Sequence, residues 1–343
     1  MGGEQFASAS LPRASAAPQV PWQDKIRNGM STKIAFLFPG QGSQTVGMGR
    51  NLAERFPIAA QTFAEADQAL GFSLSNLIFE GPEADLRLTE NTQPAILTVS
   101  VAACRVLKEH GVTPALAAGH SLGEWSAHVA AGTLSFADAV RAVKARGRAM
   151  QLAVPAGQGA MAAVLSSSPE WVVEACQEAA AETGLIVAAA NLNSPTQTVI
   201  SGALAAVEKA SAIAKAKGAR RALMLPVSAP FHCSLMQPAQ EEVARVLAAL
   251  TLADPGIPVA ANVTGGLVTT ADAARDALIR QVTGAVRWVD CIHALLAAGA
   301  NQFIEVGPGK VLCGLLRQID ADRNGLNVED AASLEATLAA LAL

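Results

Sequence analysis

Short apolar runs alternate along the chain with longer stretches in which apolar residues recur at helical spacing. The runs at 33–38, 115–118 and 303–306 are nearly continuous, which is typical of strands buried on both faces of a parallel sheet. The alternation predicts an α/β fold with a parallel central sheet. A further strand is expected at 257–261, and helices are expected at 51–70, 94–110, 122–131, 135–154, 235–250, 272–282, 288–298 and 311–319.

The pattern changes between Gly159 and Val227. Strands and helices are expected there in the order β-α-β-β-α-β, which is the order of a ferredoxin-like fold. We therefore expect a large α/β-hydrolase-like domain, residues 31–157 and 228–343, with a ferredoxin-like small subdomain at residues 158–227. The expected strands are 160–165, 185–190, 197–201 and 222–227, the helices are 169–183 and 204–217, and a loop at 191–195 joins the middle strands.

Composition narrows the class of protein. The 343 residues are 51% hydrophobic and only 16% charged, so the chain can bury a large core. Residues 1–30 lack both periodicity and the apolar segment of a secretory signal, and we expect a disordered leader. No apolar run reaches the length of a membrane span, and a net charge of −4 argues against nucleic-acid binding. The five cysteines lack metal-ligand spacing, which favours a cytoplasmic protein with reduced thiols and no metal.

The clearest chemical motif is Gly119-His120-Ser121-Leu122-Gly123. Its G-x-S-x-G spacing, with a strand before and a helix after, predicts a nucleophile elbow that projects the Ser121 hydroxyl from the sheet. The Leu122 N–H, at the helix start, would then face an oxyanion forming at this serine. The alternative is a glycine-lined turn whose serine only caps the helix.

A second polar loop, 39–44, follows the first predicted strand. It fails the G-x-G-x-x-G pattern because Thr45 stands where the third glycine belongs, and it lacks the ending of a P-loop. Ligands of open α/β sheets bind at the carboxyl ends of such strands, so its amides are candidates for a second oxyanion donor. An ordinary turn is the alternative.

A serine nucleophile needs a base, and the chain has five histidines. His232 is the best candidate, because it follows a predicted strand and lies in the same domain as the elbow. The residues alone leave its role open. The others lie beside the serine, at a helix end or within predicted helices: His110, His120, His128 and His293.

Six motifs occur in an order that resembles one family. The chain is similar, from about Thr32 to its end, to the malonyl-CoA:acyl carrier protein transacylases of bacterial type II fatty acid synthesis. These are related to the acyltransferase domains of polyketide synthases. The motifs are Phe-Pro-Gly-Gln-Gly-Ser-Gln at 38–44, Thr-Gln-Pro-Ala at 92–95, Gly-His-Ser-Leu-Gly-Glu at 119–124, Arg-Gly with Met-Gln at 146–151, Pro-Phe-His-Cys at 230–233 and Glu-Val-Gly-Pro-Gly-Lys-Val-Leu at 305–312.

The resemblance implies catalytic roles for matching positions. Ser121 would be the nucleophile that forms a malonyl-serine ester, and His232 would be the base. The backbone carbonyl of Gln281 would orient that histidine in place of a third acid. The amides of Gln41 and Leu122 would form the oxyanion hole.

The resemblance also implies a pocket for the malonyl carboxylate. Arg146 would pair with it bidentately, whereas an arginine at an unplaced helical position is usually just a solvated charge. Gln93 would line the same pocket. Phe231 departs from the small residue of some family members, and its bulk should disfavour a methyl branch on the substrate.

The implied reaction is ping-pong transfer of malonyl from malonyl-CoA, with release of CoA, to the phosphopantetheine thiol of an acyl carrier protein. It needs no cofactor, and we expect a monomer with no nucleic-acid or membrane partner. Three interpretations compete: a serine hydrolase or thioesterase, a stand-alone polyketide acyltransferase, and a carrier-binding module without catalysis. Because such carriers are acidic, candidates for a docking patch are Lys215, Lys217, Arg220, Arg221, Lys310 and Arg317.

Overall fold

The computed structural model describes residues 32–166, 168–227 and 229–342. The chain divides into two units, Met1–Thr32 and Lys33–Leu343, and every helix and strand below belongs to the second. The leader expected at residues 1–30 lies outside the described residues.

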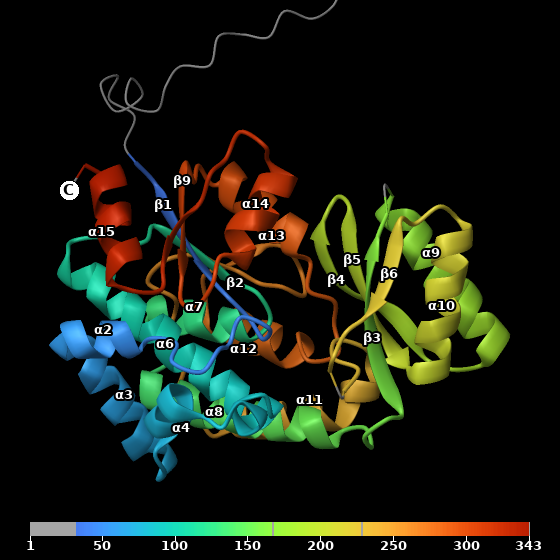
Figure 1. The fold of residues 1–343 in the computed structure, drawn as a ribbon, viewed down its shortest axis with the longest axis horizontal. Helices are drawn as coiled ribbons and strands as arrows, with labels where there is room; N and C mark the ends of the chain where they lie inside the picture. The colour runs from blue at the N-terminus through green and yellow to red at the C-terminus, as the bar shows by residue number, and fades with distance from the viewer. Residues whose placement is uncertain (1–31, 167, 228, 343) are drawn as a thin grey trace, which may run out of the picture. The chain divides into compact units, whose positions relative to one another are not determined.

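The central sheet has six strands in the order β10-β9-β1-β2-β7-β8 (Figure 1). All neighbours pair in parallel except β7 and β8, which are antiparallel. The expected parallel sheet is confirmed in its main part, and β8 makes it mixed because a short turn can join only antiparallel neighbours. The strands are β1 Ile34–Phe38, β2 Leu116–Gly119, β7 Val259–Ala260, β8 Leu267–Val268, β9 Gln302–Val306 and β10 Leu326–Val328.

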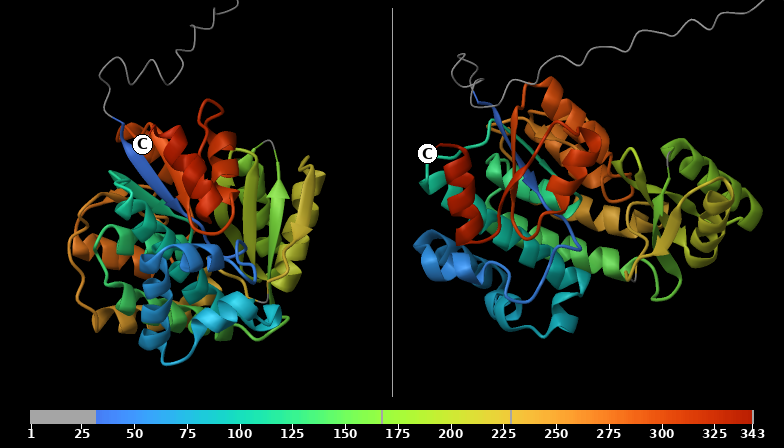
Figure 2. Two further views of the ribbon diagram at one scale, coloured as in Figure 1. Left: turned by 60° about the vertical axis from the view of Figure 1, so that its left-hand side comes forward. Right: turned by 45° about the horizontal axis from the view of Figure 1, so that its top comes forward.

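Alternate residues of β1 separate the two faces of this sheet. Phe36 and Phe38 pack into a core shared with α3, α6, α7, α8 and α11, whereas Ala35 and Leu37 pack against α13 and α14. Figures 1 and 2 show these two helix groups on opposite faces. The helices are α2 Arg50–Arg55, α3 Pro57–Leu70, α4 Leu74–Glu80, α5 Glu83–Leu86, α6 Thr89–Glu109, α7 Leu122–Ala130, α8 Phe136–Leu152, α11 Gln237–Ala248, α12 Ala271–Arg280, α13 Trp288–Ala297, α14 Val311–Ile319 and α15 Ala331–Ala340.

Three expected helices differ from the structure. The helix expected at 94–110 begins five residues earlier, at Thr89, so Pro94 lies inside α6 and does not mark its start. The helix expected at 51–70 is two helices, because Phe56 is extended and Pro57 begins α3. The helix expected at 235–250 begins with a 3₁₀ turn, Ser234–Met236, before α11.

A second sheet has four antiparallel strands in the order β4-β5-β3-β6. Two helices, α9 and α10, share a core with it and lie along one side of it in Figure 1. Its elements are β3 Gly159–Leu165, α9 Pro169–Thr183, β4 Val187–Ser194, β5 Gln197–Ala203, α10 Leu204–Ala216 and β6 Arg221–Met224.

The loop expected at 191–195 is wrong, because β4 continues to Ser194. Two register shifts let the strand keep its pairing with β5 through this polar stretch. On its other side, the Leu192 N–H donates to the Val286 carbonyl at 2.9 Å. Partners on both sides therefore hold as a strand a segment whose composition is typical of a turn.

Candidate active site

The serine motif forms a tight turn between β2 and α7. Ser121 has φ 52°, a left-handed value that a non-glycine residue adopts only where its surroundings impose it. A Cβ at Gly123 would lie 2.0 Å from the Phe38 carbonyl oxygen, and one at Gly119 would lie 1.9 Å from the Gly123 carbonyl carbon. The glycines therefore allow the helix to pack directly against the sheet. The Ser121 side chain does not cap α7, which excludes the alternative interpretation of this turn.

His232 meets this serine from the segment after the second sheet. Its Nε2 lies 2.7 Å from Ser121 Oγ, and its Nδ1 lies 2.9 Å from the Gln281 carbonyl oxygen and 3.2 Å from that of Gly284. Carbonyls only accept, so Nδ1 carries the hydrogen and Nε2 is left to accept the serine O–H. His232 also has a positive φ, 61°, as Ser121 does.

Arg146 lies beside the same hydroxyl and is buried, with 1% of its surface exposed. Its Nη2 donates to Ser121 Oγ at 3.2 Å and to Gln281 Oε1 at 2.8 Å, and its Nη1 donates to Gln93 Oε1 at 2.8 Å. The structure thus brings together residues from α6, α7, α8 and the end of α12. None of these partners is an anion.

Two side chains to which the sequence assigned no role complete the network. Asn262, directly beyond β7, accepts from the Ser121 N–H at 2.7 Å and donates through Nδ2 to the Gly119 carbonyl at 2.8 Å. Its own N–H donates to Glu124 Oε2 at 3.0 Å. The Gln281 side chain was also missed: its Nε2 donates to the Ser121 carbonyl at 2.9 Å and to Glu124 Oε2 at 2.7 Å.

Burial determines the protonation states. The pKa of His232 is lowered to about 3, mainly by desolvation and also by the charge of Arg146, while the hydrogen bond to the Gln281 carbonyl acts against the shift. Desolvation raises the pKa of Glu124 to about 7, although its hydrogen bonds and Arg146 act against this. The imidazole is therefore neutral at physiological pH, as a base must be.

A cavity of about 110 Å³ is lined by Ser121, His232 and Arg146, and also by Gln93 and His120. Gln41, Leu122 and Phe231, all expected at the site, also line it, together with Met150, Met161, Asn191, Val199, Leu225 and Val227. Since α7 begins at Leu122, that residue's N–H precedes the helix's own hydrogen bonds.

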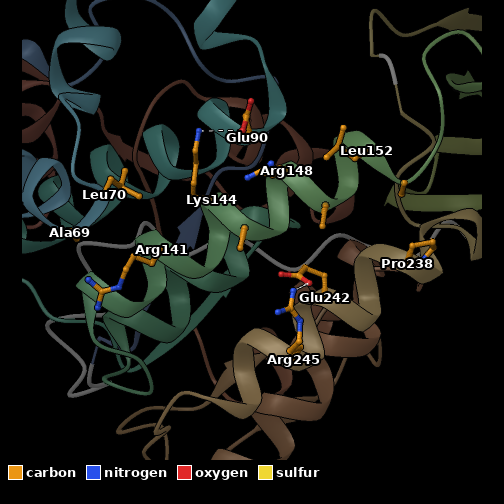
Figure 3. A pocket seen from close by; sticks show the side chains of 13 residues that line it. Ala69, Leu70, Glu90, Arg141, Lys144, Arg148, Leu152, Pro238, Glu242 and Arg245 are labelled. Carbon is orange, nitrogen blue, oxygen red and sulfur yellow. Dashed lines mark hydrogen bonds and ion pairs between the residues drawn. The ribbon is translucent and has the colours of Figure 1, made fainter.

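A larger groove of about 700 Å³ lies elsewhere on α8 (Figure 3). It is lined by Arg141, Lys144 and Arg148 of α8 and by Glu242 and Arg245 of α11, and it contains neither the serine nor the histidine. Across residues 32–166, 168–227 and 229–342, three or more His, Cys, Asp or Glu side chains nowhere gather as metal ligands. In that same part of the chain, no helix combines the length and apolarity that a bilayer crossing needs.

The fold, and a serine hydrogen-bonded to a histidine at a strand-to-helix turn, are typical of one class: α/β enzymes that handle acyl groups. The chain belongs to the acyl transferase domain family, whose model matches residues 35–334. It is an acyltransferase.

Individual relatives cover most of the chain. The malonyl CoA-acyl carrier protein transacylase of Escherichia coli O157:H7 is 52% identical over 289 residues, 84% of this chain and 93% of that protein. The protein of the same name from Bacillus subtilis (strain 168) is 48% identical over 310 residues, 90% of this chain and 98% of that protein.

Solved structures show the same fold. An acyl carrier protein S-malonyltransferase from Vibrio cholerae superimposes with a TM-score of 0.87 at 48% identity, covering 89% of this chain and all of that one. A malonyl-transacylase solved in complex with a type II polyketide synthase acyl-carrier protein gives 0.87 at 46% identity, covering 90% of this chain and all of that one.

Proposed function

We propose that the chain transfers the malonyl group of malonyl-CoA to the phosphopantetheine thiol of an acyl carrier protein, and so supplies fatty acid elongation. The observation that carries the proposal is the buried Arg146 guanidinium, whose Nη2 lies 3.2 Å from Ser121 Oγ. A carboxylate entering this cavity finds a fixed cation beside the nucleophile, whereas an acetyl group leaves that cation without an anion. The names of the relatives agree with this substrate.

Transfer proceeds through a malonyl-serine ester in two matched steps. His232 accepts the Ser121 proton as the oxygen attacks the thioester carbon, and returns it to the sulfur of departing CoA. The carrier thiol then gives its proton to His232 and attacks the ester carbon. The bond from that carbon to Ser121 Oγ breaks, and the malonyl group passes to the carrier sulfur. The histidine finally reprotonates Ser121 Oγ. The amides of Leu122 and Gln41 stabilise the oxyanion of each tetrahedral intermediate.

The proposal also includes the domain organisation of the chain. The β-α-β-β-α-β order and the strand order β4-β5-β3-β6 support a ferredoxin-like subdomain at residues 158–227, inserted between residues 31–157 and 228–343 of the catalytic domain. We propose a cytoplasmic monomer that uses no cofactor.

The proposed docking surface for the acidic carrier lies at the edge strand β6. Arg221 begins this strand, and Leu223 and Met224 beside it are 52% and 46% exposed. The chain then continues to Leu225, which lines the cavity. Lys217, another candidate, is already paired with two glutamates of α9. Arg221→Glu is therefore expected to raise the KM for the carrier in the second half-reaction, with Arg245→Glu in the groove of Figure 3 as the matched control.

Intact-mass analysis after incubation with malonyl-CoA tests the function. We expect a malonyl adduct that is absent from Ser121→Ala and that moves to added holo acyl carrier protein. Ser126→Ala is the control, because this buried hydroxyl on α7 has no partner among the described residues. An adduct lost to water regardless of the carrier would make the protein a hydrolase. If no adduct forms at all, the protein would instead be a module that binds the carrier without catalysis.

A further inference from the structure

Two ionisable groups share the interior behind the serine. Glu124 and Arg146 are 0% and 1% exposed. They are bridged by one side chain, since Gln281 donates to Glu124 Oε2 at 2.7 Å and accepts from Arg146 Nη2 at 2.8 Å. The amide thus links the two opposite charges through its own hydrogen bonds.

Both groups retain unused hydrogen-bonding capacity. Among the described residues, Glu124 Oε1 and Arg146 Nε have no hydrogen-bond partner. Oε2 of the glutamate is engaged with Gln281 and the Asn262 N–H. Arg146 therefore keeps one N–H without an acceptor among the described residues, and Oε1 of Glu124 has a lone pair that is able to take a proton.

Few other ionisable groups act on Glu124. Strands β1, β2 and β7, which pack against its helix, contain no ionisable side chain. Helices α6 and α12 also pack against it, and their ionisable residues do not shift the pKa of Glu124: Glu90, Cys104, Arg105, Lys108 and Glu109 on α6, and Asp272, Arg275, Asp276 and Arg280 on α12. Arg146 of α8 lowers the pKa of Glu124. Burial, and after it the Glu124 carboxylate, raises the pKa of the Cys291 thiol on α13, which stays neutral. The charge balance of this interior is therefore set by one glutamate and one arginine.

We propose that Glu124 is the resident counter-charge of Arg146, and that it takes up one proton when the malonyl carboxylate occupies that guanidinium. This inference rests on the proposed function. Before acylation, at a pH above about 7 where Glu124 is mostly ionised, the buried pair is neutral overall. A second carboxylate would leave a net negative charge inside the protein, and protonation of Glu124 removes it.

The proton count separates this step from the chemistry. Acylation moves the Ser121 proton to the CoA sulfur through His232 and consumes no solvent proton. The proton bound by Glu124 comes from solvent and is returned when the malonyl group leaves. Burial already raises the pKa of Glu124 to about 7, and Arg146 holds it down. Neutralising that cation with substrate raises it further, so uptake is expected at a pH of about 7.5–8.

Glu124 is thus a positioning residue, and its test is proton uptake during acylation in weakly buffered solution with a pH indicator. We expect up to about one proton per malonyl-enzyme in the wild type, and none per acetyl-enzyme formed from acetyl-CoA. Glu124→Gln keeps the shape without the titration and should abolish uptake. In the wild type, kcat/KM for malonyl-CoA should fall by up to about tenfold per pH unit above about 7, whereas the variant should be flat there.

Equal uptake with malonyl-CoA and acetyl-CoA would overturn the inference, and this comparison needs no variant. The inference also fails if Glu124→Gln lowers kcat/KM equally at every pH and keeps the wild-type profile, because a purely structural role does that. In both cases the malonyl adduct on Ser121 still forms and the proposed function stands. If the malonyl adduct on Ser121 does not form, the proposed function itself is refuted.

Discussion

Replacing Arg146 with alanine separates carboxylate recognition from acyl chemistry. The guanidinium touches Ser121 Oγ, Gln93 Oε1 and Gln281 Oε1, while the Ser121–His232 hydrogen bond does not involve it. The variant should therefore lose malonyl-CoA as a substrate but keep a neutral base and an intact nucleophile. Acetyl-CoA, which has no carboxylate, reports on that remaining machinery.

The expected magnitude follows from the number of interactions lost. A carboxylate held by Arg146 makes about two charge-assisted hydrogen bonds, each contributing about 1.5–3 kcal/mol. The sum of about 3–6 kcal/mol corresponds to about a 10²- to 10⁴-fold lower kcat/KM for malonyl-CoA. The acetyl reaction should change by less than about tenfold, because it gains nothing from the guanidinium in the wild type.

The assay is formation of the acyl-enzyme from each CoA ester, quantified by intact mass over time. Arg148→Ala is the matched control, since this residue lies two positions further along α8 and faces the groove of Figure 3. It should leave both rates unchanged. An unchanged ratio of malonyl to acetyl rates in Arg146→Ala would refute the argument that this cation selects the substrate.

Three other predictions follow from the site. Gly123→Ala should lower the free energy of unfolding by about 1–3 kcal/mol in calorimetry, because its Cβ would meet the β1 backbone, whereas Gly314→Ala, with no atom within 4 Å, should be neutral or stabilising. The lowered pKa of His232 places the acidic limb of kcat/KM below a pH of about 5, and a limb near 6.5 would contradict this. Histidine in the unfolded chain binds a proton below a pH of about 6.5, whereas folded His232 stays neutral down to about 3, so the free energy of unfolding should fall as the pH is lowered between these values. Phe231→Ala should raise methylmalonyl-CoA turnover relative to malonyl-CoA by about tenfold or more, measured in direct competition.

Local patterns predicted most of the fold. Strand β1 and the elbow are visible in the sequence because continuous apolar runs mark buried parallel strands and because two glycines frame one serine. Strands β8 and β10 have two and three residues, so they leave no periodic signal. Each of them exists because it pairs with a neighbouring strand, β8 with β7 and β10 with β9.

The site was harder to predict for the same reason. Glu124, Asn262 and Gln281 are joined by hydrogen bonds that span 138 to 157 positions. The register of the sheet brings Glu124 and Asn262 together, since their segments follow the neighbouring strands β2 and β7, and the packing of α12 against α7 adds Gln281. One signal was available: a polar residue directly after a buried strand, at the sheet edge where ligands of α/β proteins bind.

Charge inside the cavity explains why His232 is oriented by carbonyls and not by a carboxylate. The carbonyls of Gln281 and Gly284 fix the Nδ1–H without adding charge. An aspartate in their place would raise the pKa of His232 toward protonation and would compete with the substrate carboxylate for Arg146. The interior already contains Glu124, and a second resident anion would occupy the guanidinium that we propose for the malonyl carboxylate. A neutral orienting group and a buried cation together suit an acyl group that carries its own negative charge.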